Sequence, residues 1–359
     1  MIFFKYKTFS IISVSFFCLA ISNCSFVSNA NSIGQVDTTL KAIAPFPVGG
    51  AVKINLLRND RLYRNLLIKE YNSLTAENAM KFVALHPGKD SYRWEDADYI
   101  VNFALDNNIR VHGHTLIWPR VNPPWVTTFK GSRNDWKRML KTHIQTVVKH
   151  FKGKVKSWDV VNEAFEDNGT YKDNVWLRNI GKDYIELCFK YAREADPNVL
   201  LFYNDYGHEY STKKLQAVLN LVKDFKSRNI PIDGLGLQMH TVVRVTDLKI
   251  KNAINAVAST GLLIHLSELE VAINYQQPKS FIPDKTLLDR QASKYASIVK
   301  AYLSIPKKQQ YGITTWNVGD KDSWKNSKGR NHDHPLLFDY QYQPKPAYKA
   351  FKLAAEGKQ

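Results

Sequence analysis

Short apolar or β-branched runs alternate with longer amphipathic runs along almost the whole chain. We count eight such pairs, and this alternation is typical of a parallel sheet whose strands are connected by helices. The predicted strands cover residues 48–53, 71–76, 109–116, 155–161, 199–204, 233–238, 262–268 and 311–316. The predicted helices cover residues 59–70, 95–107, 133–150, 175–195, 212–228, 247–259, 286–303 and 345–354.

The ends of the predicted helices carry residues that commonly begin or end helices. Asp196-Pro197 closes the fourth helix, and Ser211-Thr212 opens the fifth. No stretch rich in Pro, Gly and Ser divides the chain. An open doubly wound sheet is the alternative, but no G-x-G-x-x-G follows the first strand. We therefore predict the α/β class and a single (β/α)₈ TIM barrel as the catalytic domain over residues 31–359.

The N-terminus has the three-part pattern of a signal peptide. Lys5 and Lys7 precede an apolar run over residues 9–21, and small polar residues follow up to Ala30. The apolar run is shorter than the roughly 20 residues that a membrane-spanning helix needs. We therefore predict a signal peptide over residues 1–30, no membrane span, and a product secreted to the extracellular space or the periplasm.

Two of the cysteines bear on processing and reactivity. Lipid attachment at Cys24 is the alternative to free secretion, although Asn23 stands where a small residue is expected before a lipid-modified cysteine. Cys188 shares an apolar helical stripe with Ile185 and Phe189. This position indicates a buried structural thiol rather than a nucleophile.

Composition and charge exclude several classes of protein. With 44% hydrophobic and 12% aromatic residues, the chain can bury a large core, which excludes a disordered or collagen-like protein. The net charge of +17 favours acidic partners, such as nucleic acid, membranes or glycans that bear uronic acids. The Lys and Arg residues are spread along the chain rather than gathered in a basic block, so we predict a solvated surface and no nucleic-acid partner. We also expect a monomer.

Polar and aromatic residues follow seven of the eight predicted strands. In a (β/α)₈ barrel the active site is built where the strands end, so these residues are predicted to meet at one mouth. They are Glu77, Asn78 and Lys81 after the second strand, His114 and Trp118 after the third, Asn162 and Glu163 after the fourth, Asn204, Asp205 and Tyr206 after the fifth, Gln238 and His240 after the sixth, Glu268 and Glu270 after the seventh, and Trp316 and Trp324 after the eighth.

Two of these residues have the chemistry that glycosidic bond cleavage requires. Glu163 and Glu268 end strands on opposite sides of the predicted mouth, and the reaction needs a proton donor and a nucleophile on either side of the anomeric carbon. Carboxylates held about 5 Å apart raise one another's pKa, so one can keep its proton. Tryptophans offer flat apolar faces for sugar rings, and the amides offer directional hydrogen bonds. This chemistry needs no metal and no other cofactor.

Eight ordered segments resemble glycoside hydrolase family 10, the β-1,4-xylanases. They are TAENAMKF (75–82), HGHTLIW (112–118), WDVVNEAF (158–165), LFYNDYG (201–207), DGLGLQMH (233–240), HLSELEV (265–271), TTWNVGDKDSW (314–324) and LLFDYQYQPKPAY (336–348). The resemblance spans nearly the whole chain after the predicted signal peptide. It implies an endo-1,4-β-xylanase that cuts xylan with retention of configuration.

The resemblance also implies roles for individual residues. Glu268 is expected to form a covalent glycosyl-enzyme, and Glu163 to act first as acid and then as base. Asn162 is expected to bind the sugar 2-hydroxyl, while Gln238 and His240 orient the nucleophile. The expected sugar-binding residues are Glu77, Asn78 and Lys81 on the non-reducing side, His114, Trp118, Trp316 and Trp324 around the site, and Tyr206 on the leaving side.

Several positions depart from the family pattern, and they affect the predicted substrate more than the predicted reaction. The departures are Pro119 and Val121 for the common His and Gln, Gly207 for Asn, Glu270 for Asp, Phe82 for Trp, and Asn317 for Gly. They leave two alternatives open. One is an endo-acting hydrolase of cellulose or mixed-linkage glucan, and the other is a glycan-binding barrel with little turnover.

A short run of His332, Asp333 and His334 lies in the predicted loop after the last strand. These residue types can bind metal ions, but the proposed chemistry needs none. We therefore expect a substrate contact or an ordinary loop here, and no metal site.

Overall fold

Eight parallel strands form a closed barrel in the computed structural model, which describes residues 1, 38–274, 281–326 and 332–357. Consecutive strands are neighbours around the ring, and the pairing of β6 with β8 closes it. The barrel strands are β1 (Val48–Val52), β2 (Ser73–Ala76), β3 (Arg110–Ile117), β4 (Ser157–Asn162), β5 (Leu200–Asp205), β6 (Gly234–Leu237), β8 (Leu263–Ala272) and β9 (Gln310–Thr315). The predicted (β/α)₈ barrel is confirmed, and each predicted strand overlaps an observed one.

One short strand was not predicted. β7 (His240–Val242) pairs in parallel with the far end of β8, where His240 lies opposite Glu270. The extra pairing lengthens β8 past the barrel rim and places His240 beside the carboxylates at the end of that strand. It therefore belongs to the site rather than to the barrel wall.

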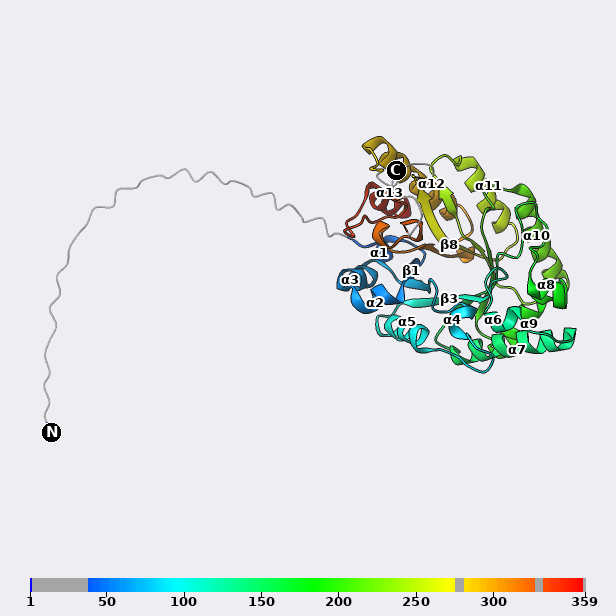
Figure 1. Cartoon of the computed structure of the whole chain (residues 1–359). Helices are drawn as coiled ribbons and strands as arrows, with labels where there is room; N and C mark the ends of the chain where they lie inside the picture. The colour runs from blue at the N-terminus through cyan, green and yellow to red at the C-terminus, as the bar shows by residue number, and fades with distance from the viewer. Residues whose placement is uncertain (2–37, 275–280, 327–331, 358–359) are drawn as a thin grey trace, which may run out of the picture. The chain divides into compact units, whose positions relative to one another are not determined.

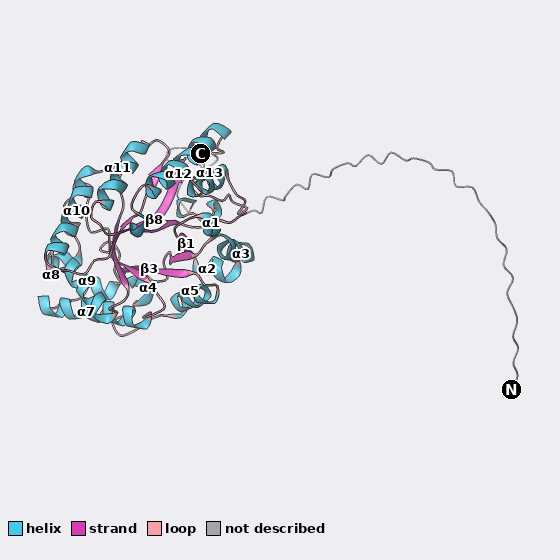
Figure 2. Cartoon of the chain, turned by 180° about the vertical axis from the view of Figure 1, so that it is seen from behind, coloured by secondary structure: helices cyan, strands magenta, loops and turns pink. Residues whose placement is uncertain are grey.

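Helices surround the barrel on its outer face (Figures 1 and 2). The longer ones are α3 (Arg61–Glu70), α5 (Glu95–Asp106), α7 (Arg133–His150), α9 (Tyr184–Ala195), α10 (Thr212–Ser227), α11 (Asp247–Ala258), α12 (Lys285–Leu303) and α13 (Pro346–Ala355). The shorter helices are α1 (Leu40–Ile43), α2 (Ile54–Asn59), α4 (Phe82–Leu85), α6 (Pro124–Thr127) and α8 (Val175–Ile180), with 3₁₀ turns η1 (Lys307–Gln309), η2 (Asp320–Asp322) and η3 (Trp324–Asn326).

The prediction of one continuous helix over residues 175–195 is wrong. The chain forms two helices, α8 and α9, and the break falls at Gly181, whose φ is +90°. A glycine adopts this conformation without steric cost, so it ends the first helix. The apolar periodicity continues across the break because both helices pack on the same core.

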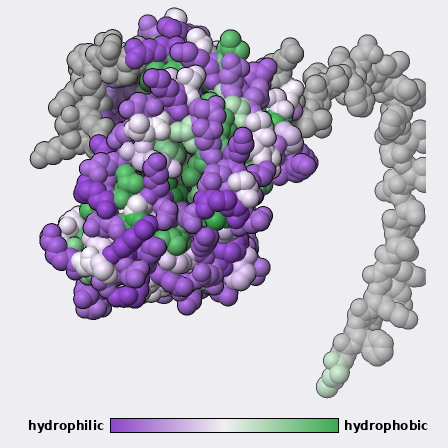
Figure 3. All heavy atoms as spheres, turned by 90° about the vertical axis from the view of Figure 1, so that its right-hand side faces the viewer, coloured by the Kyte–Doolittle hydropathy of each residue, from purple (hydrophilic) through white to green (hydrophobic). Residues whose placement is uncertain are grey.

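The core lies between the barrel and the helices, and its packing is tight. At Gly113 on β3, an added Cβ would come 2.2 Å from the ring of Trp158 on β4, so only glycine fits beside that indole. Cys188 on α9 is fully buried in this layer, as predicted, and burial raises the pKa of its thiol. Outside the core the surface is largely hydrophilic on the face that Figure 3 shows.

The N-terminal predictions fall outside the described residues. The signal peptide over 1–30 and the lipid-attachment alternative at Cys24 both lie in the segment 2–37. Within the described part of the chain, no helix combines the length and the apolar character needed to cross a bilayer.

Candidate active site

A cavity of about 500 Å³ opens where the barrel strands end, and it gathers residues from nearly every strand. Of the residues predicted to meet at the mouth, all line it except Asn78, Asn204, Asp205 and Glu270. The lining residues are Glu77, Lys81, His114, Trp118, Arg120, Asn162, Glu163, Tyr206, Gly207, Tyr210, Gln238, His240, Glu268, Trp316, Trp324 and Lys325. Of these, Arg120, Tyr210 and Lys325 were not predicted, and Gly207 was named only as a departure from the family pattern.

Asn78 is exposed, but it contacts two residues of the cavity wall. Its Nδ2 donates to Glu77 Oε1 at 3.2 Å, and its Oδ1 accepts from Lys81 Nζ at 2.9 Å. Glu77 also accepts from Asn317 Nδ2 at 2.5 Å. Asn317 has φ +89°, a conformation that Asn tolerates better than most residues. This departure from the family pattern therefore supplies a side chain that holds Glu77 in place.

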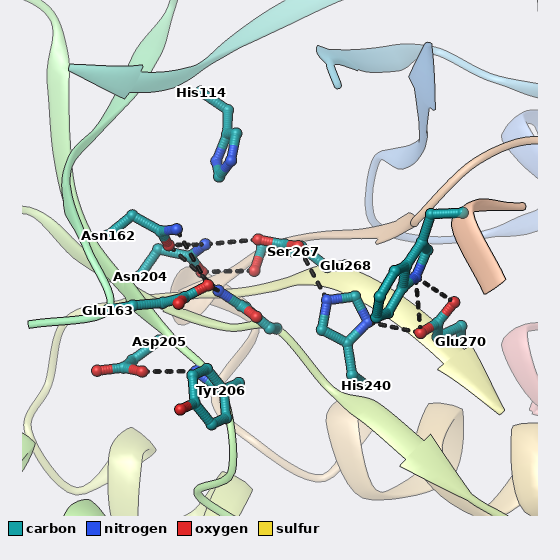
Figure 4. Close-up of polar contacts among 12 residues, drawn as sticks. His114, Asn162, Glu163, Asn204, Asp205, Tyr206, His240, Ser267, Glu268 and Glu270 are labelled. Atoms are coloured by element: carbon teal, nitrogen blue, oxygen red, sulfur yellow. Dashed lines mark hydrogen bonds and ion pairs between the residues drawn. The ribbon is translucent and has the colours of Figure 1, made fainter. Parts of the chain in front are cut away.

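Glu268 is buried and both of its carboxylate oxygens accept hydrogen bonds (Figure 4). Asn204 Nδ2 donates to Oε1 at 2.8 Å, and His240 Nε2 lies 3.0 Å from Oε2. The backbone N–H of Glu268 donates to the carbonyl of Gln238 at 3.0 Å. With the backbone and both oxygens fixed, the carboxylate can be presented to a substrate atom in one orientation.

His240 is held between two carboxylates, because its Nδ1 lies 2.8 Å from Glu270 Oε1. Burial lowers the pKa of His240, but the charge of Glu270 and the hydrogen bond to Glu268 outweigh it and raise the pKa to about 10. The ring is therefore an imidazolium at neutral pH. The longer side chain of Glu270, which departs from the usual Asp, still reaches the histidine.

Glu270 is itself fully buried and has two further partners. Trp324 Nε1 donates to both of its oxygens at 3.0 Å, and Lys325 Nζ lies 3.2 Å from Oε1. Burial raises the pKa of Glu270, but Lys325 and His240 together hold it below its ordinary value. A chain of alternating charges thus runs from Lys325 through Glu270 and His240 to Glu268.

Glu163 follows β4 directly and has φ +59°. Non-glycine residues rarely adopt this conformation, and such positions cluster at functional sites. Gln238 Nε2 donates to its Oε1 at 3.0 Å, and Lys172 Nζ lies 3.4 Å from its Oε2. The resemblance places Gln238 beside Glu268, but its side-chain amide instead donates to Glu163 and, at 3.2 Å, to Asn162.

The pKa of Glu163 differs from the expectation that the two carboxylates raise one another's pKa. Burial raises the pKa of Glu163, but the hydrogen bond from Gln238 and the charge of Lys172 outweigh burial and leave it below its ordinary value. Neighbouring donors and a cation therefore dominate over carboxylate repulsion at this position. Lys172 was not predicted, because it lies in a loop and nothing in its local sequence marks it.

Two amides connect the carboxylates. Asn162 Oδ1 accepts from Asn204 Nδ2 at 2.9 Å, and Asn162 Nδ2 donates to Glu163 Oε1 at 3.3 Å. Because Asn204 also donates to Glu268, an unbroken set of hydrogen bonds joins Glu163 to Glu268 across the cavity floor (Figure 4). The Oδ1 of Asn204 is fixed in turn by Ser267 Oγ at 2.6 Å.

The ring of Tyr206 is supported from below by charged residues. The ammonium of the fully buried Lys214 lies 3.2 Å from the ring centroid and 2.9 Å from Asp205 Oδ1. Lys172 Nζ lies 4.7 Å from the same ring, so the lysine beside Glu163 also contacts this wall. Burial raises the pKa of Asp205 to about 6 although Lys214 opposes it. The tyrosine face is thereby held at the side of the cavity nearest Glu163.

The opposite wall carries His114 and Trp316. His114 Nδ1 lies 2.8 Å from Asp159 Oδ2, and its ring meets Trp316 edge to face at 5.3 Å. Asp159 also pairs with His112 at 3.0 Å. Burial opposes ionisation of Asp159, but the two histidines hold its pKa well below the ordinary value.

The run of His332, Asp333 and His334 has a structural explanation. Asp333 Oδ1 accepts the backbone N–H groups of Ile273 and Asn274, each at 3.0 Å, and that of His334 at 2.7 Å. The carboxylate therefore ties this loop to the end of β8. Among the described residues, no group of three or more His, Cys, Asp or Glu is arranged to hold a metal ion.

Comparisons with known proteins agree with this geometry. Residues 37–354 match the profile described as Glycosyl hydrolase family 10. The chain is 36% identical to Endo-1,4-beta-xylanase B of Thermotoga neapolitana over 334 residues, which cover 91% of this chain and 94% of that protein. It is 38% identical to Exoglucanase XynX of Acetivibrio thermocellus over 85% of this chain, but spans only 28% of that longer protein.

Solved structures of xylanases are also similar to this chain. Xylanase 10B of Thermotoga petrophila RKU-1, crystallised in complex with xylobiose, is 37% identical with a TM-score of 0.83, and the match covers 89% of this chain and 97% of that one. The family profile spans the barrel and every residue that lines the cavity. The chain belongs to glycosyl hydrolase family 10.

Proposed function

We propose that the protein is an endo-1,4-β-xylanase that hydrolyses internal bonds of xylan with retention of configuration. The observation that carries the proposal is the placement of Glu163 and Glu268, which come from different strands, line one cavity and are joined by a continuous set of hydrogen bonds. Two carboxylates that flank one sugar supply the acid and the nucleophile of a double displacement. The relatives named as xylanases support the choice of xylan.

In the first step, Glu268 attacks the anomeric carbon while Glu163 protonates the departing glycosidic oxygen. The bond from the anomeric carbon to that oxygen breaks, and a covalent glycosyl-enzyme forms on Glu268. In the second step, Glu163 removes a proton from water, and the resulting attack releases Glu268. In this mechanism Asn162 binds the sugar 2-hydroxyl, and the positively charged ring of His240 orients the carboxylate of Glu268.

The low pKa of Glu163 has a consequence for the pH dependence. The first step needs Glu163 protonated, and the pKa of Glu163 lies below its ordinary value before substrate binds. Sugar binding excludes water from the carboxyl group, which favours the neutral form. The proposal therefore includes a pH optimum on the acid side of neutrality, with activity falling as the pH rises.

The test is reducing-sugar release from xylan, carboxymethylcellulose and mixed-linkage β-glucan, measured side by side. We expect the highest rate on xylan, a rapid fall in viscosity that marks internal cleavage, and the β-anomer as the first product by NMR. A first product of α configuration would exclude retention. A higher rate on either glucan would show that a glucan and not xylan is the substrate. Glucan is the second candidate, because one relative is named as an exoglucanase.

We further propose that the protein is exported and cleaved after Ala30, on the basis of the N-terminal pattern. Mass spectrometry of the protein from the culture medium or periplasm should show an N-terminus at Asn31. Recovery in the membrane fraction, reversed by Cys24→Ala, would instead support lipid attachment.

A further inference from the structure

Arg120 is a cation of the cavity wall without an acidic partner. Its side chain is exposed and lines the cavity, and no Asp or Glu among the described residues pairs with its guanidinium. The other cations of the wall are already engaged. Lys325 pairs with Glu270, and Lys81 donates to Asn78.

The backbone around Arg120 is a tight turn. The N–H of Val121 donates to the carbonyl of Trp118 at 3.1 Å, which places Pro119 and Arg120 at the two central positions of a β-turn. Proline at the first of these positions restricts the backbone in advance, because its φ is fixed by the ring. Arg120 is therefore presented to the cavity from a defined position rather than from a long loose loop.

The side chain of Asn122 ties this turn to the rest of the molecule. Its Nδ2 donates to the carbonyl of Pro119 at 3.0 Å, and its Oδ1 accepts from the indole Nε1 of Trp176 at 2.9 Å. Trp176 is fully buried on α8. The guanidinium thus extends from a turn that the core holds in place.

Of the three turn residues that follow Trp118, only Arg120 has a side chain that can hydrogen-bond to substrate. Pro119 and Val121 have apolar side chains, where family members commonly carry His and Gln that can bond sugar hydroxyls. Positions 119 and 121 therefore supply no neutral hydrogen-bonding side chain for sugar hydroxyls, and position 120 supplies one permanent positive charge. A neutral xylose backbone has no group that matches such a charge.

We propose that Arg120 binds the carboxylate of a uronic-acid side group on the xylan chain, so that acid-substituted xylan is the preferred substrate. The planar guanidinium can donate two parallel hydrogen bonds to one carboxylate, which is a strong and directional contact. The chain has a net charge of +17, of which the proposed signal peptide carries only Lys5 and Lys7, and this positive charge favours the approach of such a polyanionic polymer. The inference rests on the proposed function, because it names the substrate class of the same site.

The test compares glucuronoxylan with the same polymer after chemical reduction of its carboxyl groups to primary alcohols. The backbone and the positions of the side groups stay the same, so only the negative charge differs. Wild-type kcat/KM is expected to be about fivefold higher on the acidic polymer, the scale of a partly exposed ion pair. That ratio should fall in 1 M salt, where the Debye length is about 3 Å.

Three variants assign the effect to one residue. Arg120→Gln should bring the ratio close to one, because it lowers kcat/KM more on the acidic polymer than on the reduced polymer, and Arg120→Lys should keep part of the preference. Arg93→Gln is the matched control, because it removes the same charge from an exposed residue that does not line the cavity. It should leave the ratio unchanged.

The outcomes separate this inference from the proposed function. A wild-type ratio of one or less, or an unchanged ratio in Arg120→Gln, would overturn the role of Arg120 while xylanase activity stands. Equal losses in Arg120→Gln and Arg93→Gln would overturn it as well, since net charge alone would then explain the preference. Inactivity of the wild type on linear xylo-oligosaccharides would instead overturn the proposed function.

Discussion

The two carboxylates of the cavity are held by different kinds of partner. Glu268 lies between an amide and an imidazolium, Asn204 and His240, both from strands of the sheet. Glu163 lies between an amide and an ammonium, Gln238 and Lys172, and the lysine comes from a loop.

The difference shows how one barrel can hold the nucleophile in a fixed orientation while the pKa of the acid can change. Behind Glu268 the charges continue inward through His240 to the fully buried Glu270. Any change there disturbs a connected set of ionic contacts. On the acid/base side, the hydrogen bond from Gln238 and the charge of the loop residue Lys172 together hold the pKa of Glu163 below its ordinary value. Lys172 can be replaced without removing a strand residue. Four substitutions test this contrast.

The largest effect is expected at the nucleophile. Glu268→Ala should lower kcat by about four orders of magnitude or more on every substrate, since no glycosyl-enzyme can form. Steady-state rates on xylan and on an aryl xyloside would measure this loss of kcat. A near-normal rate on both would contradict the assignment. Addition of azide should restore no retained product, because the nucleophile and not the acid is missing.

The next effect concerns the acid/base. Glu163→Ala should lower turnover of xylan by about 10² to 10⁴-fold, the usual range for loss of a general acid or base. Formation of the glycosyl-enzyme from an aryl xyloside with an acidic leaving group should be nearly unaffected, because that group needs no protonation. A burst of released phenol in pre-steady-state kinetics would show this. Equal losses on both substrates would contradict the role of Glu163.

The inner charges of the nucleophile side are tested by Glu270→Gln. Burial lowers the pKa of His240 and the charge of Glu270 opposes it, so removal of this charge should lower the pKa of His240 from about 10. NMR titration of the ring measures the change. We expect kcat to fall about tenfold, the scale of one ionic hydrogen bond. An unchanged His240 titration would show that Glu268 alone maintains the imidazolium.

The smallest effect on rate is expected at Lys172. Lys172→Met leaves the burial of Glu163 less opposed, so the pKa of Glu163 should rise and the basic limb of the pH profile of kcat/KM should move to higher pH. The rate at the optimum should change by less than about threefold. Lys172→Arg keeps the charge and should keep the wild-type profile. A limb that stays in place in Lys172→Met would remove Lys172 from the control of Glu163.

The sequence by itself determined the barrel and the two carboxylates. Alternation of apolar strands with amphipathic helices is a local pattern, so it identified all eight barrel strands from residue spacing. In parallel strands the carboxyl ends meet at one rim, and this rule was sufficient to bring Glu163 and Glu268 to one cavity. The break at Gly181 was missed because apolar periodicity does not register a change of helix axis.

Only the tertiary structure decided which groups surround those carboxylates. Arg120 and Lys325 line the cavity and Lys172 contacts Glu163, but all three lie in loops or in a 3₁₀ turn, so no strand rule places them there. The side chain of Gln238 reaches Glu163, and local sequence does not encode that direction. A pKa depends on burial and on charges a few ångströms away in space, so the low pKa of Glu163 follows from the folded arrangement and not from the order of residues.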